Sequence, residues 1–403
     1  MSIVVMKFGG TSVATPDLIK AAARKVARLQ KNHDVVVVVS AMGHTTDQLF
    51  KMGHQITPNP KARELDMLLT AGERISVALL SIALDQMKLQ SISFTGSQVG
   101  IITDTKHTDA RIIEIRGDRV RNALNDGKIP VICGFQGVSG EKEITTLGRG
   151  GSDTTALALT AVLNAEKCII YTDVDGVYTE DPNRFPGVQK IDKISYDEML
   201  ELSSRGAQVL HPRASGIAAR HRVPVEIRNS FNNRKGTLIT KLEGLEHPQP
   251  KAITHGDDLY LITLIQVLRR PRYLSQIVNE LTDGGVHLKF FFHGVSEAKR
   301  FDLSFITPLV EKDIVKQILK KMITRLEINR IREAIDIVSI SVIGHGIGSD
   351  SKVLNDTFNA LAKAKAHVEA ITTSELSLNI FLRKKYRDQA IKSLLNKFNL
   401  CKK

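Results

Sequence analysis

The sequence predicts a three-layer α/β domain over residues 1–245, followed by two small α+β units. In the first part, short continuous runs of β-branched residues alternate with amphipathic helical patterns, which is typical of parallel strands buried on both faces. In the last part, the same succession of expected strands and helices is found twice, one copy after the other. Because 403 residues exceed what a single hydrophobic core usually accommodates, several domains are expected.

The expected strands of the first part are each followed by turn residues. Between the first two strands, Thr15 is the expected N-cap of a helix that has Pro16 at its first position and ends near Gln30. In such domains ligands bind at the carboxyl ends of the strands. The strands are expected at residues 3–6, 35–39, 129–133 and 168–171.

The rest of the chain is expected to hold a linker at 246–257 and two similar units at 258–335 and 336–403. Each unit reads as strand, helix, strand, strand, helix, the order of a ferredoxin-like module. The first unit adds a last strand near 327–332, and the second is expected to lack one, which leaves an open sheet edge that a partner would cover. The matching stretches lie 75 residues apart: 301–306 with 376–381, and helices that begin at Asp313 and Asp388.

Composition narrows the class of protein. The formal charge of +13 divides into +4 for residues 1–250 and +9 for residues 251–403. A basic part can bind nucleic acid, but these charges are spread over helix faces with few aromatic residues among them, which favours solvated faces. The three cysteines form no CxxC pair, as is typical of a reducing compartment, so a cytoplasmic protein is expected. Neither a signal peptide nor a membrane span of ~20 apolar residues is expected.

The most informative segment is TTLGRGGSDTT at residues 145–155, which leads into an alanine- and leucine-rich helical stretch. It places bare backbone N–H groups, the Arg149 guanidinium and the Ser152 hydroxyl at a helix N-terminus, where the helix dipole favours anions. The alternative is a plain strand-to-helix turn, which would need only the glycines.

Two more segments follow expected strands. Lys7-Phe8-Gly9-Gly10 brings a lysine and a backbone without side chains close to a phosphate, or simply forms a tight turn. After the second strand, Ser40 and Thr46 supply hydroxyl groups.

Acidic residues mark two further segments. Glu73 stands beside Arg74 in a helical region, where an ordinary surface ion pair is the alternative to a binding role. Residues 171–184 gather several aspartates at another strand end, where an Asp-Gly turn is the alternative. Taken together, the lysine and glycines suit nucleotide phosphates, the arginine and glutamate suit the charged ends of an amino acid, and the acids suit Mg²⁺.

These motifs give the chain a specific resemblance. It resembles the aspartate kinases (aspartokinases) of the amino-acid-kinase family, followed by two ACT domains, almost from end to end. The resemblance implies transfer of the γ-phosphoryl group of MgATP to the β-carboxylate of L-aspartate. There is no third catalytic region, so the chain does not resemble the fused aspartokinase–homoserine dehydrogenases. The motifs that carry the resemblance are KFGGTS, SAMGHTTD, LLTAGER, GFQG, TTLGRGGSDTT and TDVDGVYTEDP.

The resemblance also implies roles for individual residues. Lys7 would bridge the transferred phosphoryl group, Asp153 would orient Lys7, and Arg149 would hold the α-carboxylate of the substrate. Glu73 would hold its α-ammonium group, and no metal-ligating side chain is assigned. Contacts with the rest of the aspartate are expected from Ser40, Thr46, Phe135, Gly150, Gly151 and Ser152, and contacts with ATP from Phe8, Gly9, Gly10, Thr172, Asp173, Tyr178, Asp181, Arg184 and Gln208.

The sequence departs from the family pattern at several positions. Gln208 replaces a lysine that reaches the ATP phosphates, and Asn183 replaces an arginine, which predicts weak ATP binding. In the first ACT unit His287 replaces an asparagine that caps the effector, which predicts weak or altered feedback by lysine or threonine. Other altered effector-loop positions are Arg270, Pro271, Arg272, Phe292, His293, Gly294 and Ser296 in the first unit and Ser349, Asp350 and Ser351 in the second.

Two alternatives to an active aspartate kinase stay open. One is a catalytically weak regulatory or binding paralogue, and the other is a kinase for a different small acid such as glutamate. The resemblance further implies a homodimer and the first step of lysine, threonine and methionine biosynthesis.

Overall fold

The structure is a computed structural model, which describes residues 1–242, 248–295 and 299–402. Its contacts divide the chain into two compact units. Unit 1 consists of Met1–Thr179 and Gln189–Leu245, and unit 2 of Glu180–Val188 and Glu246–Lys403. A short segment of the expected first domain therefore belongs to the second unit.

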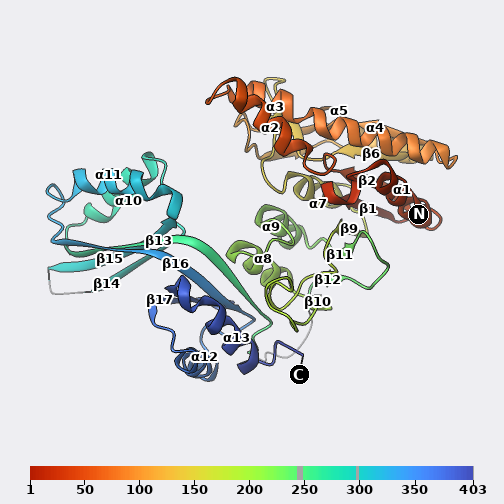
Figure 1. Cartoon of the computed structure of the whole chain (residues 1–403). Helices are drawn as coiled ribbons and strands as arrows, with labels where there is room; N and C mark the ends of the chain where they lie inside the picture. The colour runs from red at the N-terminus through yellow and green to blue at the C-terminus, as the bar shows by residue number, and fades with distance from the viewer. Residues whose placement is uncertain (243–247, 296–298, 403) are drawn as a thin grey trace. The chain divides into compact units, whose positions relative to one another are not determined.

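Unit 1 is built on an eight-stranded sheet in the order β10-β12-β11-β9-β1-β2-β6-β3 (Figure 1). The central strands are parallel, and only the β11–β12 pair is antiparallel. All four expected strands are confirmed as parts of β1, β2, β6 and β9. The strands are β1 Ile3–Phe8, β2 Asp34–Val39, β3 Ser91–Phe94, β6 Ile129–Cys133, β9 Lys167–Thr172, β10 Lys193–Ile194, β11 Val225–Asn229 and β12 Thr237–Ile239.

Helices cover both faces of this sheet, as the three-layer prediction requires. On one face α1 and α4 pack on alternate residues of β1, including Val4, Met6 and Phe8. On the other face α7 packs against β1, β2 and β9. The helices are α1 Pro16–Gln30, α2 Thr45–Ile56, α3 Ala62–Leu69, α4 Ala71–Gln86, α5 Gly96–Val99, α6 Asp118–Asn125, α7 Gly151–Val162, α8 Tyr196–Arg205 and α9 Pro212–His221, with a 3₁₀ turn, η1, at Gly10–Val13.

The first helix begins as its sequence predicts. The Thr15 side chain accepts a hydrogen bond from the Leu18 N–H, and Pro16 occupies the first helical position. A second, four-stranded sheet in unit 1 has the order β5-β4-β7-β8 and ends just before α7. Its strands are β4 Ile101–Thr103, β5 Ile112–Ile115, β7 Gln136–Ser139 and β8 Ile144–Thr146.

Unit 2 has one six-stranded antiparallel sheet in the order β14-β15-β13-β16-β18-β17 (Figure 1). The expected repeat is confirmed, because α11 and α13 have the same length and begin 75 residues apart. The elements are β13 Ala252–Leu268, α10 Tyr273–Asp283, β14 Phe290–Val295, β15 Arg300–Pro308, η2 Leu309–Glu311, α11 Lys312–Met322, β16 Arg330–Ile343, α12 Ser351–Lys363, β17 Val368–Thr373, β18 Ser377–Arg383, η3 Lys384–Tyr386 and α13 Arg387–Lys397.

The two long strands β13 and β16 belong to both repeats. Residues 259–265 of β13 and 330–337 of β16 pair in the first repeat, and 252–256 of β13 pairs with 339–343 of β16 in the second. The edge expected to be open for want of a last strand is thus filled by the beginning of β13. The linker prediction is also wrong in part, because β13 begins at Ala252; residues 246 and 247 lie outside the described part of the chain.

One stretch contradicts the expectation that no segment is long and apolar enough to span a membrane. Helical residues Ala62–Gln86 pass that test by length and composition, with a mean hydropathy of 1.6. The same stretch buries Val77, Leu80 and Leu84 against the central sheet. We therefore interpret it as a core helix of unit 1.

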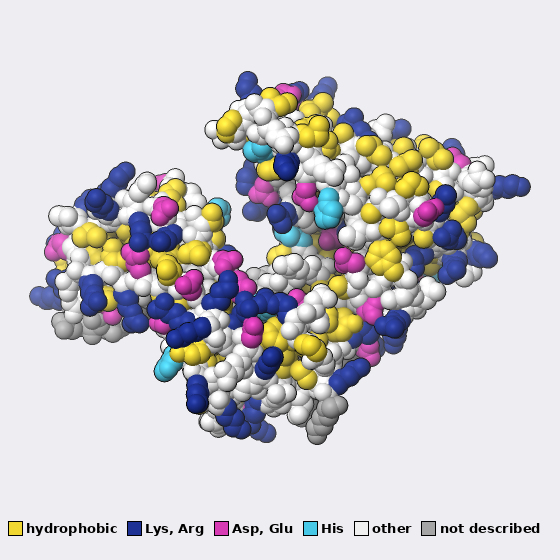
Figure 2. All heavy atoms as spheres, in the orientation of Figure 1, with side chains coloured by type: hydrophobic (Ala, Val, Ile, Leu, Met, Phe, Trp, Pro, Cys, Tyr) yellow, Lys and Arg dark blue, Asp and Glu magenta, His cyan; other side chains and the backbone are white. Residues whose placement is uncertain are grey.

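Charged side chains on the face seen in Figure 2 agree with the solvated-face interpretation. Lysine and arginine side chains are spread over both units and interspersed with acidic and apolar ones.

Candidate active site

The ends of β1 and β2 lie side by side and bring two of the predicted segments together. The Ser40 N–H donates to the Phe8 carbonyl over 3.1 Å, and the Gly43 N–H donates to the Gly10 carbonyl over 2.9 Å. A Cβ atom on Gly10 would lie 2.8 Å from the Gly43 carbonyl oxygen, so only glycine fits there. Thr46 follows in the first turn of α2.

Lys7 and Asp153 form the central ion pair of the site. The Lys7 Nζ lies 2.6 Å from Asp153 Oδ1, and both side chains are almost buried, with 10% and 14% of their surfaces exposed. Lys7 comes from the end of β1 and Asp153 from the first turn of α7. The helix dipole favours a carboxylate at that position.

The N-terminus of α7 offers backbone donors, as the TTLGRGGSDTT segment predicts. No side chain caps this helix, and its N-cap, Gly150, has a φ of +69°. A Cβ atom there would lie 2.2 Å from the His211 Cβ, so a side chain is excluded. Arg149 precedes the helix with an exposed side chain, whereas Gly151 and Ser152 are buried.

Phe135 lies against this helix start. It adopts a left-handed backbone conformation with a φ of +69°, which is costly for a residue with a side chain and is concentrated at functional sites. A Cβ atom on Gly151 would lie 2.9 Å from the Phe135 ring, and the Phe135 carbonyl accepts the Leu147 N–H. The ring therefore lies beside the first turn of α7.

Glu73 is buried, so the surface ion pair considered for it is wrong. Only 2% of the residue is exposed, and its Oε1 accepts the Ala41 N–H over 3.1 Å. Its Oε2 has no hydrogen-bond partner among the residues that the structure describes. Burial raises the pKa of Glu73 to about 7, although the backbone hydrogen bonds act in the opposite direction. A cationic group would satisfy both the free oxygen and the buried charge.

In the acidic segment after β9, one aspartate is held by hydrogen bonds within the protein and another is exposed to solvent. Asp175 accepts hydrogen bonds from Asn229 and Asn232, both over 2.8 Å, and pairs with Arg234. These bonds, the one from Asn232 foremost, hold the pKa of Asp175 below its usual value. Asp173 is exposed instead, and Thr172 donates to it over 3.2 Å.

Tyr178 is half-buried and pairs with Lys190 across a short antiparallel bridge. Burial, followed by the negative charge of Asp175, raises the pKa of its phenol. Gln208 is exposed between α8 and α9.

Two of the predicted ATP contacts, Asp181 and Arg184, belong to the segment that packs in unit 2. The Arg184 guanidinium lies 3.5 Å from Asp257 and 3.9 Å from Asp388. Next to it, Glu180 contacts His255 over 3.2 Å. These contacts hold the segment in unit 2.

Phe8 can offer only its main chain to a ligand. Its ring is 1% exposed and stacks on Tyr171, with centroids 4.8 Å apart and planes inclined by 7°. It faces α1 and α4, whereas Lys7 faces α7.

Sequence reasoning missed the residues that hold the TTLGRGGSDTT segment in place. The fully buried Asp66 accepts the Thr146 hydroxyl over 2.6 Å and the Thr108 N–H over 3.1 Å. Arg213 donates to the Leu147 and Ala110 carbonyls from the segment that follows Gln208. Asp66 gave no signal, because it stands in an ordinary amphipathic helix, whereas Arg213 lies only five residues after Gln208, which stood out in the sequence.

No group of three or more histidine, cysteine, aspartate or glutamate side chains is arranged to hold a metal ion among the described residues.

Comparisons with known proteins show the family of the chain. The sequence profile of the Amino acid kinase family matches residues 2–229, and that of the ACT domain matches residues 340–398. The chain is 39% identical to an aspartokinase of Geobacillus stearothermophilus over 402 residues, which covers 99% of this chain and 98% of the relative. It is 40% identical to an aspartokinase of Thermus thermophilus over 409 residues, which covers both chains fully.

Solved structures show the same fold. Escherichia coli aspartokinase III in complex with aspartate and ADP superimposes with a TM-score of 0.82 at 23% identity, over 98% of this chain and all of that one. Aspartate kinase from Synechocystis is 37% identical with a TM-score of 0.55, over 98% of this chain and 69% of that one.

The parent protein should lose stability as the pH rises because of Glu73, and the substitution Glu73→Gln should remove this loss. Unfolded, this carboxyl has an ordinary pKa near 4.5, whereas in the folded protein the pKa is about 7. Between these values the folded protein keeps a proton that the unfolded chain has released, so stability falls as the pH rises. We expect the variant to gain about 2 kcal/mol in free energy of unfolding relative to the parent between pH 5 and pH 8.

Urea unfolding at both pH values measures this difference. The control is Glu64→Gln, which changes an exposed glutamate of α3 and should show no such gain. An unchanged difference between the Glu73 variant and the parent would mean that Glu73 is already ionised at pH 5.

Proposed function

Because the chain belongs to the aspartokinases of the amino acid kinase family, we propose that it transfers the γ-phosphoryl group of MgATP to the β-carboxylate of L-aspartate. The products are 4-phospho-L-aspartate and ADP, and the reaction is the first step of lysine, threonine and methionine biosynthesis. The similarity to aspartokinases over the whole chain is the observation that carries this proposal. We also propose a cytoplasmic homodimer.

The chemistry asks for alignment and charge neutralisation. A carboxylate is already ionised at neutral pH, so its oxygen attacks the γ-phosphorus without a general base. The bond between that phosphorus and the bridging oxygen of ATP breaks, and ADP leaves with the electron pair. Mg²⁺ enters with the nucleotide as part of the substrate. The protein's task is to hold the two negatively charged reactants close together.

The ion pair at the end of β1 suits the phosphoryl group. The Lys7 ammonium group would neutralise charge on the transferred oxygens, with the Gly9 and Gly10 backbone nearby. Asp153 would keep Lys7 in position, since its carboxylate lies 2.6 Å from the ammonium. In this proposal Lys7 is the catalytic residue, and Asp153 is a positioning residue that acts through Lys7.

The two charged ends of aspartate have matching groups. Arg149, exposed at the start of α7, would bind the α-carboxylate with support from the helix N–H groups. Glu73 would bind the α-ammonium group through its unpartnered Oε2. A bound ammonium group would lower the raised pKa of Glu73 and ionise it. Ser40, Thr46, Phe135 and Ser152 would complete the pocket.

The nucleotide would contact Thr172, Asp173 and Tyr178 after β9, and Asp181 and Arg184 in the segment that follows. Gln208 supplies no charge to the phosphates where the family usually has lysine. We therefore propose weak ATP binding.

The first experiment is formation of aspartyl hydroxamate from L-aspartate, MgATP and hydroxylamine. The parent should form it, and Lys7→Met should lower kcat at least about 100-fold, because charge stabilisation at the phosphoryl group is lost. The control, Lys20→Met, removes an exposed lysine of α1 and should keep the parent rate. No product from the parent would favour the weak paralogue, and product from L-glutamate in place of aspartate would favour another acid as substrate.

Gln208→Lys should lower the KM for ATP several-fold, since it adds a charge-assisted contact to the phosphates. Initial rates at saturating aspartate measure this change. Ser204→Lys, which adds the same charge at an exposed position of α8, is the control. An unchanged KM in the Gln208 variant would contradict the weak-binding proposal.

The first ACT module supports altered feedback. The His287 N–H donates to Glu311 Oε2 over 2.9 Å, and its ring Nδ1 lies 2.6 Å from Glu311 Oε1. The Glu311 carboxylate therefore already occupies the main-chain N–H and the ring nitrogen that His287 could offer to an effector. Ser296 lies outside the described residues.

Lysine and threonine below about 1 mM, singly or together, should therefore leave the hydroxamate rate nearly unchanged, because a buried effector would lack partners for its charged groups. Rates measured over a concentration series of each amino acid test this expectation. Inhibition in the submillimolar range would contradict it.

A further inference from the structure

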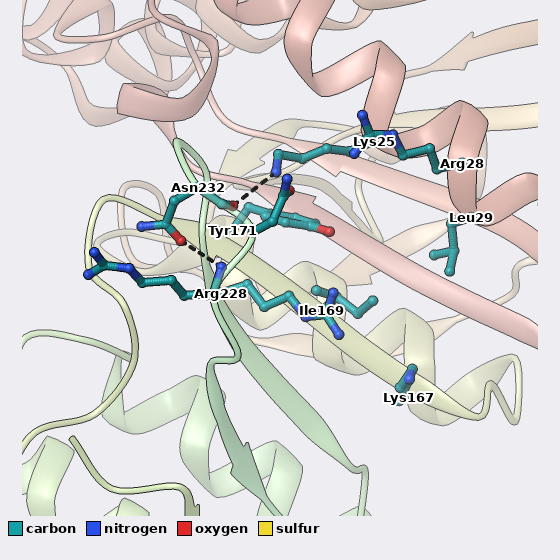
Figure 3. A pocket seen from close by; sticks show the side chains of 10 residues that line it. Lys25, Arg28, Leu29, Lys167, Ile169, Tyr171, Arg228 and Asn232 are labelled. Carbon is teal, nitrogen blue, oxygen red and sulfur yellow. Dashed lines mark hydrogen bonds between the residues drawn. The ribbon is translucent and has the colours of Figure 1, made fainter.

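Unit 1 contains a cavity of about 220 Å³ (Figure 3). It lies on the face of the sheet opposite to Lys7 and Asp153. Tyr171 lines it, and this ring stacks on Phe8, which packs with α1 and α4. Lys7, the preceding residue of β1, faces α7. Because successive residues of a strand point to opposite faces, the cavity is separate from the candidate active site.

Five cationic side chains line this cavity, which we call the α1–β9 pocket. Two carboxylates lie close to them: Glu226, within 2.6 Å of Arg228 and 3.9 Å of Lys167, and Asp175, within 3.1 Å of Arg234. Positive charge therefore exceeds negative charge. The cations are Lys25, Arg28, Lys167, Arg228 and Arg234.

Lys25 and Arg28 contribute most of this excess. Neither has a carboxylate within ion-pair distance among the described residues. They stand one helical turn apart on α1, so both reach the same side of the helix. Like charges at this spacing repel each other, and an anion between them would remove the repulsion.

Lys25 is held in position over the pocket. Its Nζ lies 3.5 Å from the Asn232 carbonyl oxygen and 5.2 Å from the centre of the Tyr171 ring, and Figure 3 shows it reaching from α1 toward this segment. Burial, and then the charges of Arg28 and Arg228, lower its pKa. A side chain that is oriented and under positive potential is already arranged for an anionic ligand.

The floor of the pocket strengthens the electrostatic effect. Ile169 and Tyr171 are 2% and 6% exposed, so the cations stand over a poorly hydrated surface where charge interactions are less screened. The volume is below the ~300–1,000 Å³ of common ligand pockets, which favours a small ligand.

We propose that the α1–β9 pocket binds a small polyvalent anion through phosphate or carboxylate oxygens. The pocket adjoins residues 9–12, which follow β1, through two contacts: the Tyr171 carbonyl accepts the Gly9 N–H over 3.1 Å, and the Ser230 hydroxyl lies 2.5 Å from that of Ser12. Ser230 lies between the lining residues Arg228 and Asn232 in the chain. The inference does not depend on which acid the enzyme phosphorylates.

Isothermal titration of the full chain with pyrophosphate and, separately, with citrate tests the proposal. Both titrations are made at constant ionic strength, without Mg²⁺, and with ADP and L-aspartate present to occupy the active site. One anion per chain should bind at about 1 mM or tighter. The two probes distinguish a phosphate-bearing from a carboxylate-bearing ligand by which of them binds more tightly.

Variants assign the binding to the pocket. Lys25→Met and Arg28→Ala should each weaken it about tenfold, and Arg28→Glu should abolish it. Arg24→Ala removes the same charge from an exposed position of α1 outside the pocket and should leave the Kd within about twofold. Lys7→Met should also leave it unchanged. Urea unfolding of each variant verifies that it is folded.

Three results would overturn the proposal. The first is no binding of either anion at millimolar concentration. The second is loss of binding in Lys7→Met with binding kept in the Lys25 and Arg28 variants, which would place the anion in the active site. The third is an equal loss in Arg24→Ala, which would show attraction to the helix surface in general.

Discussion

The pairing of Lys7 with Asp153 is the interaction on which the proposed catalytic arrangement depends. It joins the end of the first strand to the first turn of α7, and both partners are nearly buried. Removing one partner of such a pair leaves an uncompensated charge in the interior, which is strongly destabilising. The glycines around the pair are there for space, since a side chain at Gly10 or Gly150 would collide with neighbouring backbone or with His211.

Much of this could be predicted from the sequence, because the features are local. The β-branched runs of the central strands, the Thr15 cap and Pro16 each act through their immediate neighbours, and the structure confirms them. The motifs also identified the segments whose backbones meet at the ends of β1 and β2, and the two residues of the Lys7–Asp153 pair. The predictions of an open sheet edge and of a linker up to residue 257 were wrong, because they depended on contacts between segments far apart in the sequence. Residues 252–256 of β13 pair with β16 and complete the sheet of the second repeat. Nothing in the sequence of these residues indicates this pairing.

The same limit explains the errors within the site. Glu73 and Arg74 are adjacent in sequence, but the helix turns Glu73 into the protein and leaves Arg74 outside. Asp66 supports the segment before α7 from another helix, with no motif around it. The apolar stretch through α3 and α4 has the composition of a membrane span, and only its packing against the sheet distinguishes it from one.

The segment Glu180–Val188 has a consequence for how such chains evolve. It begins within the TDVDGVYTEDP motif, yet it packs with unit 2 through Arg184 and Glu180. Recombination at a single crossover could join unit 1 of one relative to unit 2 of another. The segment Glu180–Val188 would then come from one parent, and the residues that it contacts would come from the other. For these ion pairs to persist, Asp257 and His255 would have to change together with Arg184 and Glu180.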